Sequence, residues 1–160
     1  MRFVLDTNIL IKAFNNQSPD CIALVWRFYG DSNLGIVFDS GERMIEKEYR
    51  QNLQHNEMYQ KWLVSMSGCQ ISYMSGKLNA KIKSKLEKLG FHESSDQVFV
   101  AVALNSDKNL VSEDSDYGKG NEARANSPEK QEVLKYMTES LGLNVMDSIE
   151  GLRFIRQLAI

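Results

Sequence analysis

Short apolar segments alternate with longer helical segments along this chain, and this alternation limits the possible folds more than any other feature. The predicted strands are 2–5, 34–38, 69–73, 109–112 and 143–146. The predicted helices are 19–29, 39–54, 56–66, 77–89, 129–141 and 148–158. Strands that alternate with helices predict an α/β fold with a parallel sheet, because each parallel connection needs a crossover. The segment 98–104 fits either class, since its valines favour a strand and the polar residues before it favour a helix.

Chain length and composition predict one globular domain over residues 1–160. The chain has 160 residues, of which 42% are hydrophobic, which is enough for one core and too little for two comfortable domains. It contains no run of about 18 apolar residues, and Asp6 interrupts the stretch that a signal peptide would need. Cys21 and Cys69 are too few for a disulfide framework or a zinc site. We therefore expect a cytoplasmic protein with no membrane partner.

Two strands of the predicted sheet end in an acidic residue. Asp6 follows the strand 2–5, and Asp114 follows the strand 109–112. Ligands of open α/β sheets bind outside the carboxyl ends of the strands, so both acids should lie on that edge. Asp96 opens a helix and reaches the same edge if the chain returns there, although an acid in the first turn of a helix is also common on electrostatic grounds alone.

A further acid lies on the helix 39–54. At 100° per residue Glu48 falls between Met44 and Ile45, on the buried shoulder of the helix, where a lone carboxylate is costly. If the helix is rotated by one residue from this phase, Glu46 is the better candidate. Carboxylates that converge repel one another unless a cation lies between them, and Mg²⁺ or Mn²⁺ suits oxygen ligands. One or two such ions are expected, and Asp116 could reach a second ion.

Four sequence blocks resemble the PIN-domain nucleases, in that family's order. They are Val4-Leu5-Asp6-Thr7-Asn8, Glu48-Tyr49, Asp96 with the apolar segment 98–103, and the segment 110–117 around Asp114. Together they extend from Met1 to about Tyr117. The resemblance implies a three-layer sandwich with a central, mainly parallel five-stranded sheet flanked by helices, and it assigns 98–104 to a helix. It also implies that the four acids hold the metal, and that such proteins hydrolyse RNA, often as toxins or RNA-processing enzymes.

The main hypothesis is a divalent-metal-dependent endoribonuclease that uses a metal-activated water. Its expected catalytic residues are Asp6, Glu48, Asp96 and Asp114, with Asp116 as a further metal ligand and Thr7, Asn8 and Ser112 as supporting hydrogen-bonding residues. RNA is the expected partner and DNA a possible one, and an antitoxin-like or processing partner or a homodimer is also compatible. The alternatives are a DNA nuclease of the same chemistry and a catalytically silent binding module. A phosphatase of the haloacid-dehalogenase type fits poorly, because Asn8 occupies the position of its second aspartate.

Basic residues that could hold nucleic acid occur in two groups. Lys77, Lys81, Lys85 and Lys88 recur at helical spacing beside a leucine face, within a chain whose net charge is −2. Arg43, Lys47 and Arg50 flank Glu48 and could orient a phosphate. The lysine group could equally be a solvated helix face. Tyr49 and Tyr117 could stack on a base, although packing in the core is the favoured alternative for Tyr49. The long segment 118–128 after the fourth acid could cover the site or be disordered.

Overall fold

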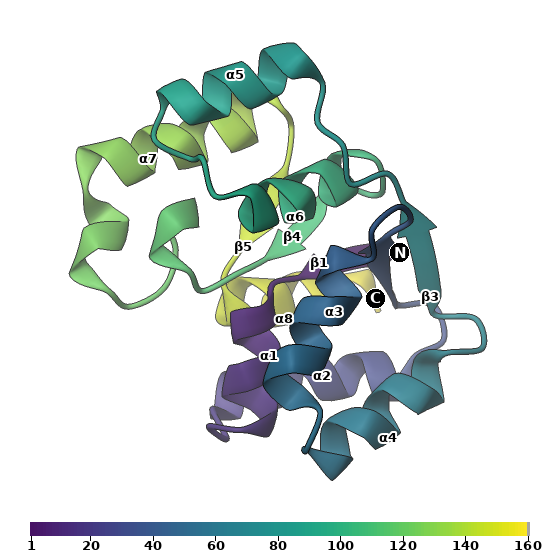
Figure 1. The fold of residues 1–160 in the computed structure, drawn as a ribbon. Coiled ribbons are helices and arrows are strands. Elements are labelled where there is room, and N and C mark those ends of the chain that lie inside the picture. The colour runs from purple at the N-terminus through teal and green to yellow at the C-terminus, as the bar shows by residue number, and fades with distance from the viewer. Residues whose placement is uncertain (160) are drawn as a thin grey trace.

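The computed structural model describes residues 1–159 and contains one five-stranded sheet (Figure 1). Its strands are β1 (Arg2–Leu5), β2 (Gly35–Asp39), β3 (Ile71–Met74), β4 (Asn109–Val111) and β5 (Asn144–Met146). They lie in the order β3-β2-β1-β4-β5, and every neighbouring pair is parallel. The predicted α/β class is confirmed, and the sheet is wholly parallel.

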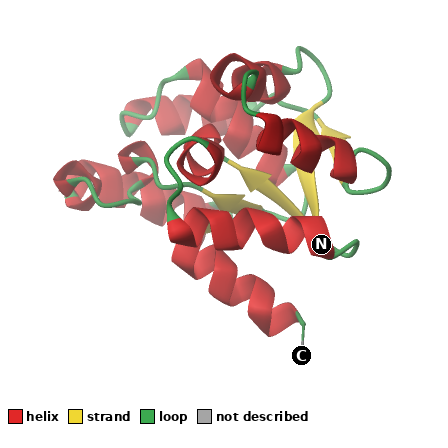
Figure 2. Ribbon diagram, turned by 90° about the horizontal axis from the view of Figure 1, so that it is seen from below, coloured by secondary structure: helices red, strands yellow, loops and turns green. Residues whose placement is uncertain are grey.

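Helices cover both faces of the sheet, so that the strands lie between two helical layers (Figure 2). The α-helices are α1 (Thr7–Phe14), α2 (Pro19–Gly30), α3 (Met44–Leu53), α4 (Glu57–Met66), α5 (Ala80–Lys88), α6 (Ser94–Leu104), α7 (Pro128–Lys135) and α8 (Ser148–Leu158). In Figure 1, α5, α6 and α7 lie above the sheet, and α1, α2, α4 and α8 lie below it. No helix within residues 1–159 has the length and apolar character needed to cross a membrane.

Two 3₁₀ turns and one π turn complete the described elements. They are η1 (Ser115–Tyr117), η2 (Ala123–Asn126) and the π turn η3 (Tyr136–Ser140). The π turn continues directly from α7, so the predicted helix 129–141 exists as an α-helix that changes its hydrogen-bonding pattern in its second half. The segment 98–104 is helical and lies within α6, as the resemblance implied.

The buried centre of the sheet consists of β1, β2 and β4. Phe3, Val4 and Leu5 have no exposed surface, as expected for a strand that has neighbours on both sides and helices on both faces. Leu5 is in register with Val111 of β4, so these strands end at the same level. The residues that follow them, Asp6 and Ser112, therefore begin side by side at the carboxyl edge of the sheet.

Two predicted helix starts are wrong. The helix α3 begins at Met44 rather than at 39, because Asp39 ends β2 and its carboxylate accepts hydrogen bonds from the amides of Met44 and Ile45 across a loop. The helix α5 begins at Ala80 rather than at 77, since the Asn79 side chain accepts a bond from the Lys81 amide and caps it. The polar residues 94–97, which favour a helix, form the first turn of α6, and this helix starts without a side-chain cap.

Candidate metal centre

Asp6 is buried at the carboxyl edge, and Ser112 connects it to Asp114. Only 4% of Asp6 is exposed. The Ser112 hydroxyl donates to Oδ2 of Asp6 at 2.6 Å and accepts the backbone N–H of Asp114 at 3.0 Å. Ser112 itself is fully buried. One hydroxyl therefore fixes the position of the β1 acid relative to the β4 acid.

Asn8 makes a second connection between the same two chain segments. Its Nδ2 donates to Oδ2 of Asp6 at 3.1 Å, and its Oδ1 accepts the N–H of Glu113 at 3.2 Å. The carboxylate of Glu113 is bound elsewhere, by Lys12 at 2.7 Å and by the Ser148 hydroxyl. Burial acts to raise the pKa of Glu113, but these hydrogen bonds outweigh it and lower the pKa. Glu113 is thereby held as a structural ion pair next to the site.

The rotation of α3 distinguishes Glu48 from Glu46. The Thr7 hydroxyl donates to Oε1 of Glu48 at 2.6 Å, which places this carboxylate beside the residue that follows Asp6. Glu46 instead pairs with Arg43 at 3.7 Å and with Arg50 at 3.8 Å. Side chains two positions apart on a helix point in directions about 200° apart around the helix axis. Glu48 therefore faces the other acids, and Glu46 faces away from them.

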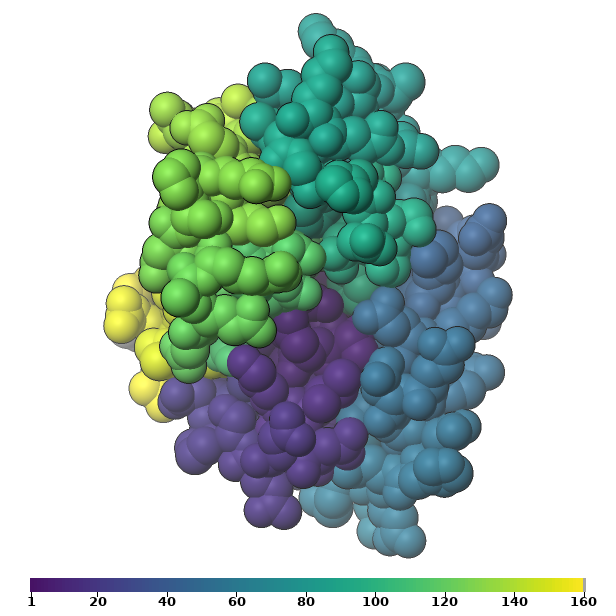
Figure 3. All heavy atoms as spheres, turned by 60° about the vertical axis from the view of Figure 1, so that its left-hand side comes forward, coloured from purple at the N-terminus to yellow at the C-terminus, as the bar shows by residue number. Residues whose placement is uncertain are grey.

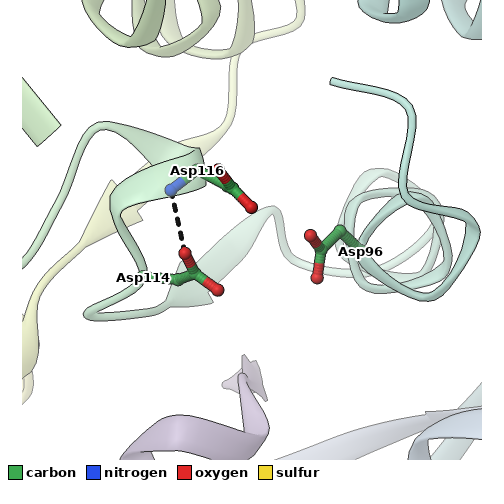
Figure 4. Close-up of side chains that lie close together, drawn as sticks. All are labelled: Asp96, Asp114 and Asp116. Atoms are coloured by element: carbon green, nitrogen blue, oxygen red, sulfur yellow. Dashed lines mark hydrogen bonds between the residues drawn. The ribbon is translucent and has the colours of Figure 1, made fainter. Parts of the chain in front are cut away.

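Asp96, Asp114 and Asp116 form the tightest group of carboxylates. One oxygen from each lies within 4.8 Å of one oxygen from each of the others (Figure 4). Asp96 comes from the first turn of α6, opposite the other two. Oδ1 of Asp114 accepts the N–H of Asp116 at 2.9 Å and thereby caps the short helix η1. The capping bond orients Asp114 and places Asp116 next to it.

The electrostatic environment penalises negative charge on these acids. Burial raises the pKa of Asp6 from 3.8 to about 7, and the charges of Asp114 and Glu48 add to the rise, while the Ser112 hydrogen bond offsets part of it. Burial also raises the pKa of Asp96 to about 8, together with the charges of Asp6, Asp114, Asp116 and Glu48. Burial together with the charge of neighbouring acids therefore disfavours ionisation of Asp6 and of Asp96.

The donor set of this group fits a hard divalent cation. All donors are carboxylate oxygens, which Mg²⁺ and Mn²⁺ prefer, and neither histidine nor cysteine belongs to the group. A divalent charge at this place would relieve the repulsion that raises the pKa values of Asp6 and Asp96. Within residues 1–159 no second cluster of three or more His, Cys, Asp or Glu ligand atoms has this spacing. We refer to Asp96, Asp114 and Asp116 as the aspartate cluster.

Comparisons with known proteins assign no family. No protein-family model, no curated protein and no solved structure matches the chain. The chemistry of the site therefore rests on the residues described above.

Two cations next to Asp116 were not expected from the sequence. Oδ1 of Asp116 accepts a hydrogen bond from the Arg124 guanidinium at 2.8 Å and forms an ion pair with the Lys130 ammonium at 2.9 Å. Arg124 lies on η2, within the segment 118–128, and this segment folds beside the aspartate cluster. The Arg124 side chain also donates a hydrogen bond to the Ser115 hydroxyl. Neither residue carries a local sequence signal, because their place at the site depends on the path of the chain after β4.

The structure separates the basic residues expected to hold nucleic acid. Lys81, Lys85 and Lys88 share one face of α5 and line a hollow of about 420 Å³ with Tyr136. The Lys85 ammonium lies 6.0 Å from the centroid of the Tyr136 ring. Lys77 precedes α5 and lines a different hollow, at the ends of β2 and β3. Of the four lysines predicted to lie together, only Lys81, Lys85 and Lys88 therefore do so.

Two residues of the second basic group, Arg43 and Arg50, lie with Glu46 on the side of α3 that faces away from the acids. Arg43 and Arg50 pair with Glu46, and the Arg43 guanidinium also lies 5.1 Å from the centroid of the Tyr73 ring. Lys47 is exposed and forms no ion pair within residues 1–159. The structure does not bring these three residues to the aspartate cluster.

The two tyrosines considered for base stacking are both fully buried. The Tyr49 hydroxyl donates to the carbonyl of Leu5, and the Tyr117 hydroxyl donates to the carbonyl of Asp96 at 3.2 Å. The stacking hypothesis is therefore wrong for both, because neither ring can reach a base from the core. Tyr117 instead supports the first turn of α6, from which Asp96 projects.

Proposed function

We propose that this protein is a Mg²⁺- or Mn²⁺-dependent endoribonuclease of the PIN-domain type. The observation that supports this function most strongly is the convergence of carboxylates from four separate segments at the carboxyl edge of a parallel sheet. These acids are Asp6, Glu48, Asp96 and the pair Asp114 and Asp116. A shared binding site for cations explains why a fold would keep acids together at an electrostatic cost.

The chemistry suits hydrolysis of a phosphodiester. A divalent cation bound here would supply a Lewis acid and lower the pKa of a bound water. The aspartate cluster supplies the oxygens to hold such a cation. The hydroxyls of Ser112 and Thr7 fix the carboxylates of Asp6 and Glu48 in place, so that these two acids can complete the ligand set directly or through water. No covalent protein nucleophile is needed.

Exposed positive charge on α5 supports a nucleic-acid substrate. Lys81, Lys85 and Lys88 on α5 are exposed, and the segment after this helix leads through Gly90 and His92 to Asp96. Backbone phosphates bind to such exposed lysines with little sequence preference. Figure 3 shows the face on which the N-terminal segment, coloured purple, meets the blue, teal and green segments that carry the remaining acids.

The test is cleavage of labelled single-stranded RNA by the purified protein in Mn²⁺, Mg²⁺ or EDTA. We expect cleavage that requires the metal and is abolished in Asp6→Asn and Asp114→Asn, with Glu132→Gln, an exposed acid of α7, as the control. Circular dichroism checks that the variants fold. Cleavage of DNA in preference to RNA would reassign the substrate. Cleavage by folded Asp114→Asn at the wild-type rate would refute the metal site.

A further inference from the structure

A polar cavity of about 380 Å³ adjoins the aspartate cluster. Its walls include two members of the cluster, Asp96 and Asp116, and both cations that pair with Asp116. Arg124 reaches the cavity from the solvent side, with 57% of its side chain exposed, whereas Lys130 is mostly buried, with 14% exposed. The cavity therefore contains two cations that form ion pairs with Asp116, one of the proposed metal ligands.

The charges in this cavity are not balanced. Glu93 and Glu129 also line it, so that four carboxylates face two cations. An anion that enters meets a surplus of negative charge, and both cations are already paired with the same oxygen of Asp116. A divalent cation on the aspartate cluster would offset this surplus and compete for Asp116. The positive charge of Arg124 and Lys130 would then be available to another anion.

We propose that Arg124 and Lys130 bind a backbone phosphate of single-stranded RNA in this cavity, and that they do so when a divalent cation occupies the aspartate cluster. The proposal rests on the proposed function for the identity of the substrate. Asp116 then has two partners in alternation: the two cations when the metal is absent, and the metal when RNA is bound. The arrangement makes metal and RNA binding mutually reinforcing, since coupling between two sites is reciprocal.

The first experiment measures binding without cleavage. A fluorescein-labelled RNA of ten uridines is titrated with protein in Ca²⁺, which takes oxygen ligands as Mg²⁺ does, and in EDTA, with fluorescence anisotropy as the readout. In Ca²⁺ we expect Arg124→Ala and Lys130→Met each to weaken binding by about tenfold, because each removes a hydrogen bond between a charged side chain and the phosphate. The slope of log Kd against log salt should fall by about 0.7 for one lost phosphate contact. In EDTA the same variants should differ little from the wild type.

Matched controls separate this site from general charge effects. Arg156→Ala and Lys135→Ala remove one exposed positive charge each, from α8 and from the end of α7, and neither residue lines the cavity. If Arg124→Ala weakens RNA binding in Ca²⁺ no more than these controls do, the proposal is wrong. Arg124 is largely exposed, so this variant decides the question even if Lys130→Met fails to fold.

Asp116→Asn tests the alternation directly. In EDTA this change should release Lys130 and leave Arg124 paired only with the exposed Glu122, at 3.3 Å. RNA affinity should then rise several-fold, and the gain should disappear in the double variant Asp116→Asn/Arg124→Ala. Glu93→Gln is the matched control, because it removes one negative charge from the same cavity and Glu93 forms no ion pair within residues 1–159. An equal gain in Glu93→Gln would overturn the proposal.

The outcomes distinguish the two proposals. Metal-dependent binding that requires Arg124, without RNA cleavage in Mn²⁺, would support the phosphate site and refute the nuclease function. Cleavage of RNA by a protein whose binding ignores Arg124, Lys130 and Asp116 would support the nuclease function and refute the phosphate site. Absence of RNA binding in Ca²⁺ would refute the phosphate site.

Discussion

Replacing Asp6 with asparagine should stabilise the protein in EDTA, and should do so more at high pH. Asp6 is nearly completely buried next to two other acids, and its pKa rises from 3.8 to about 7. Asparagine removes the charge but keeps an oxygen that can accept the hydrogen bonds from Ser112 and Asn8. The substitution therefore changes the electrostatics with little change in packing.

The magnitude follows from the pKa. A tenfold change in an acid dissociation constant corresponds to about 1.4 kcal/mol, so the rise to about 7 makes the ionised carboxylate cost about 4 kcal/mol. The folded protein holds the proton of Asp6 more tightly than the unfolded chain does. The stabilisation that protonated Asp6 contributes is therefore fully present below about pH 4 and is lost as the pH rises to about 7. About 3 kcal/mol of the loss falls between pH 5 and pH 8. Asp96, whose pKa rises to about 8, acts in the same direction.

The assay is urea unfolding at pH 5 and pH 8, with EDTA present. The pKa of Glu113 and that of Glu150 are lowered, so their contributions are complete above about pH 5 and do not disturb this window. We expect the wild-type free energy of unfolding to fall by several kcal/mol between the two pH values. In Asp6→Asn the fall should be smaller by up to about 3 kcal/mol, whereas Glu139→Gln, an exposed acid, should behave as the wild type does.

Two results would contradict the reasoning. A wild-type stability that is constant or rises from pH 5 to pH 8 in EDTA would mean that burial and the neighbouring acids do not raise the pKa of Asp6 and Asp96 in the folded protein. A pH dependence in Asp6→Asn as steep as that of the wild type would mean that Asp6 is not the acid responsible. In either case the convergence of the acids would no longer support a metal site.

Three further predictions follow from the same geometry. Mn²⁺ at 100 times its dissociation constant should stabilise the wild type by about 2.7 kcal/mol in thermal melts, and Asp114→Asn should be more stable in EDTA but respond less to Mn²⁺; melting curves indifferent to the metal would exclude the shared site. Lys81→Glu/Lys85→Glu should weaken RNA binding and flatten its salt dependence in anisotropy titrations, whereas unchanged binding would identify α5 as a solvated face. Thr7→Val should lower the free energy of unfolding in Mn²⁺ by about 1 kcal/mol, since it removes the hydrogen bond to Glu48; an unchanged urea midpoint would show that this bond does not stabilise the protein.

The sequence by itself determined the class of the fold and the edge on which the acids lie. Apolar strands that alternate with helices require a parallel sheet, and Asp6 and Asp114 must then lie near one edge because each comes shortly after a strand. Local signals also located the start of α2, at Pro19. These features depend on neighbouring residues, so the chain order is sufficient to predict them.

Only the tertiary structure decided which side chains meet at that edge. The rotation of α3, which turns Glu48 toward Thr7 and Glu46 toward two arginines, is set by packing of Ile45 and Tyr49 against the core. The pattern of apolar residues fixes the rotation of a helix about its axis only to within about one residue, or 100°.

The cations at Asp116 and the fate of Tyr117 also required the folded chain. Arg124 and Lys130 reach Asp116 because the segment after η1 turns back beside it. Tyr117 is buried at the end of η1, where its hydroxyl donates to the carbonyl of Asp96 in the first turn of α6. The path of an irregular segment is fixed by its contacts with distant residues rather than by local preference. Contacts of that kind exist only after the sheet and helices have assembled. The sequence could therefore predict the acids and their hydrogen-bonding partners Thr7, Asn8 and Ser112, but not the cations Arg124 and Lys130.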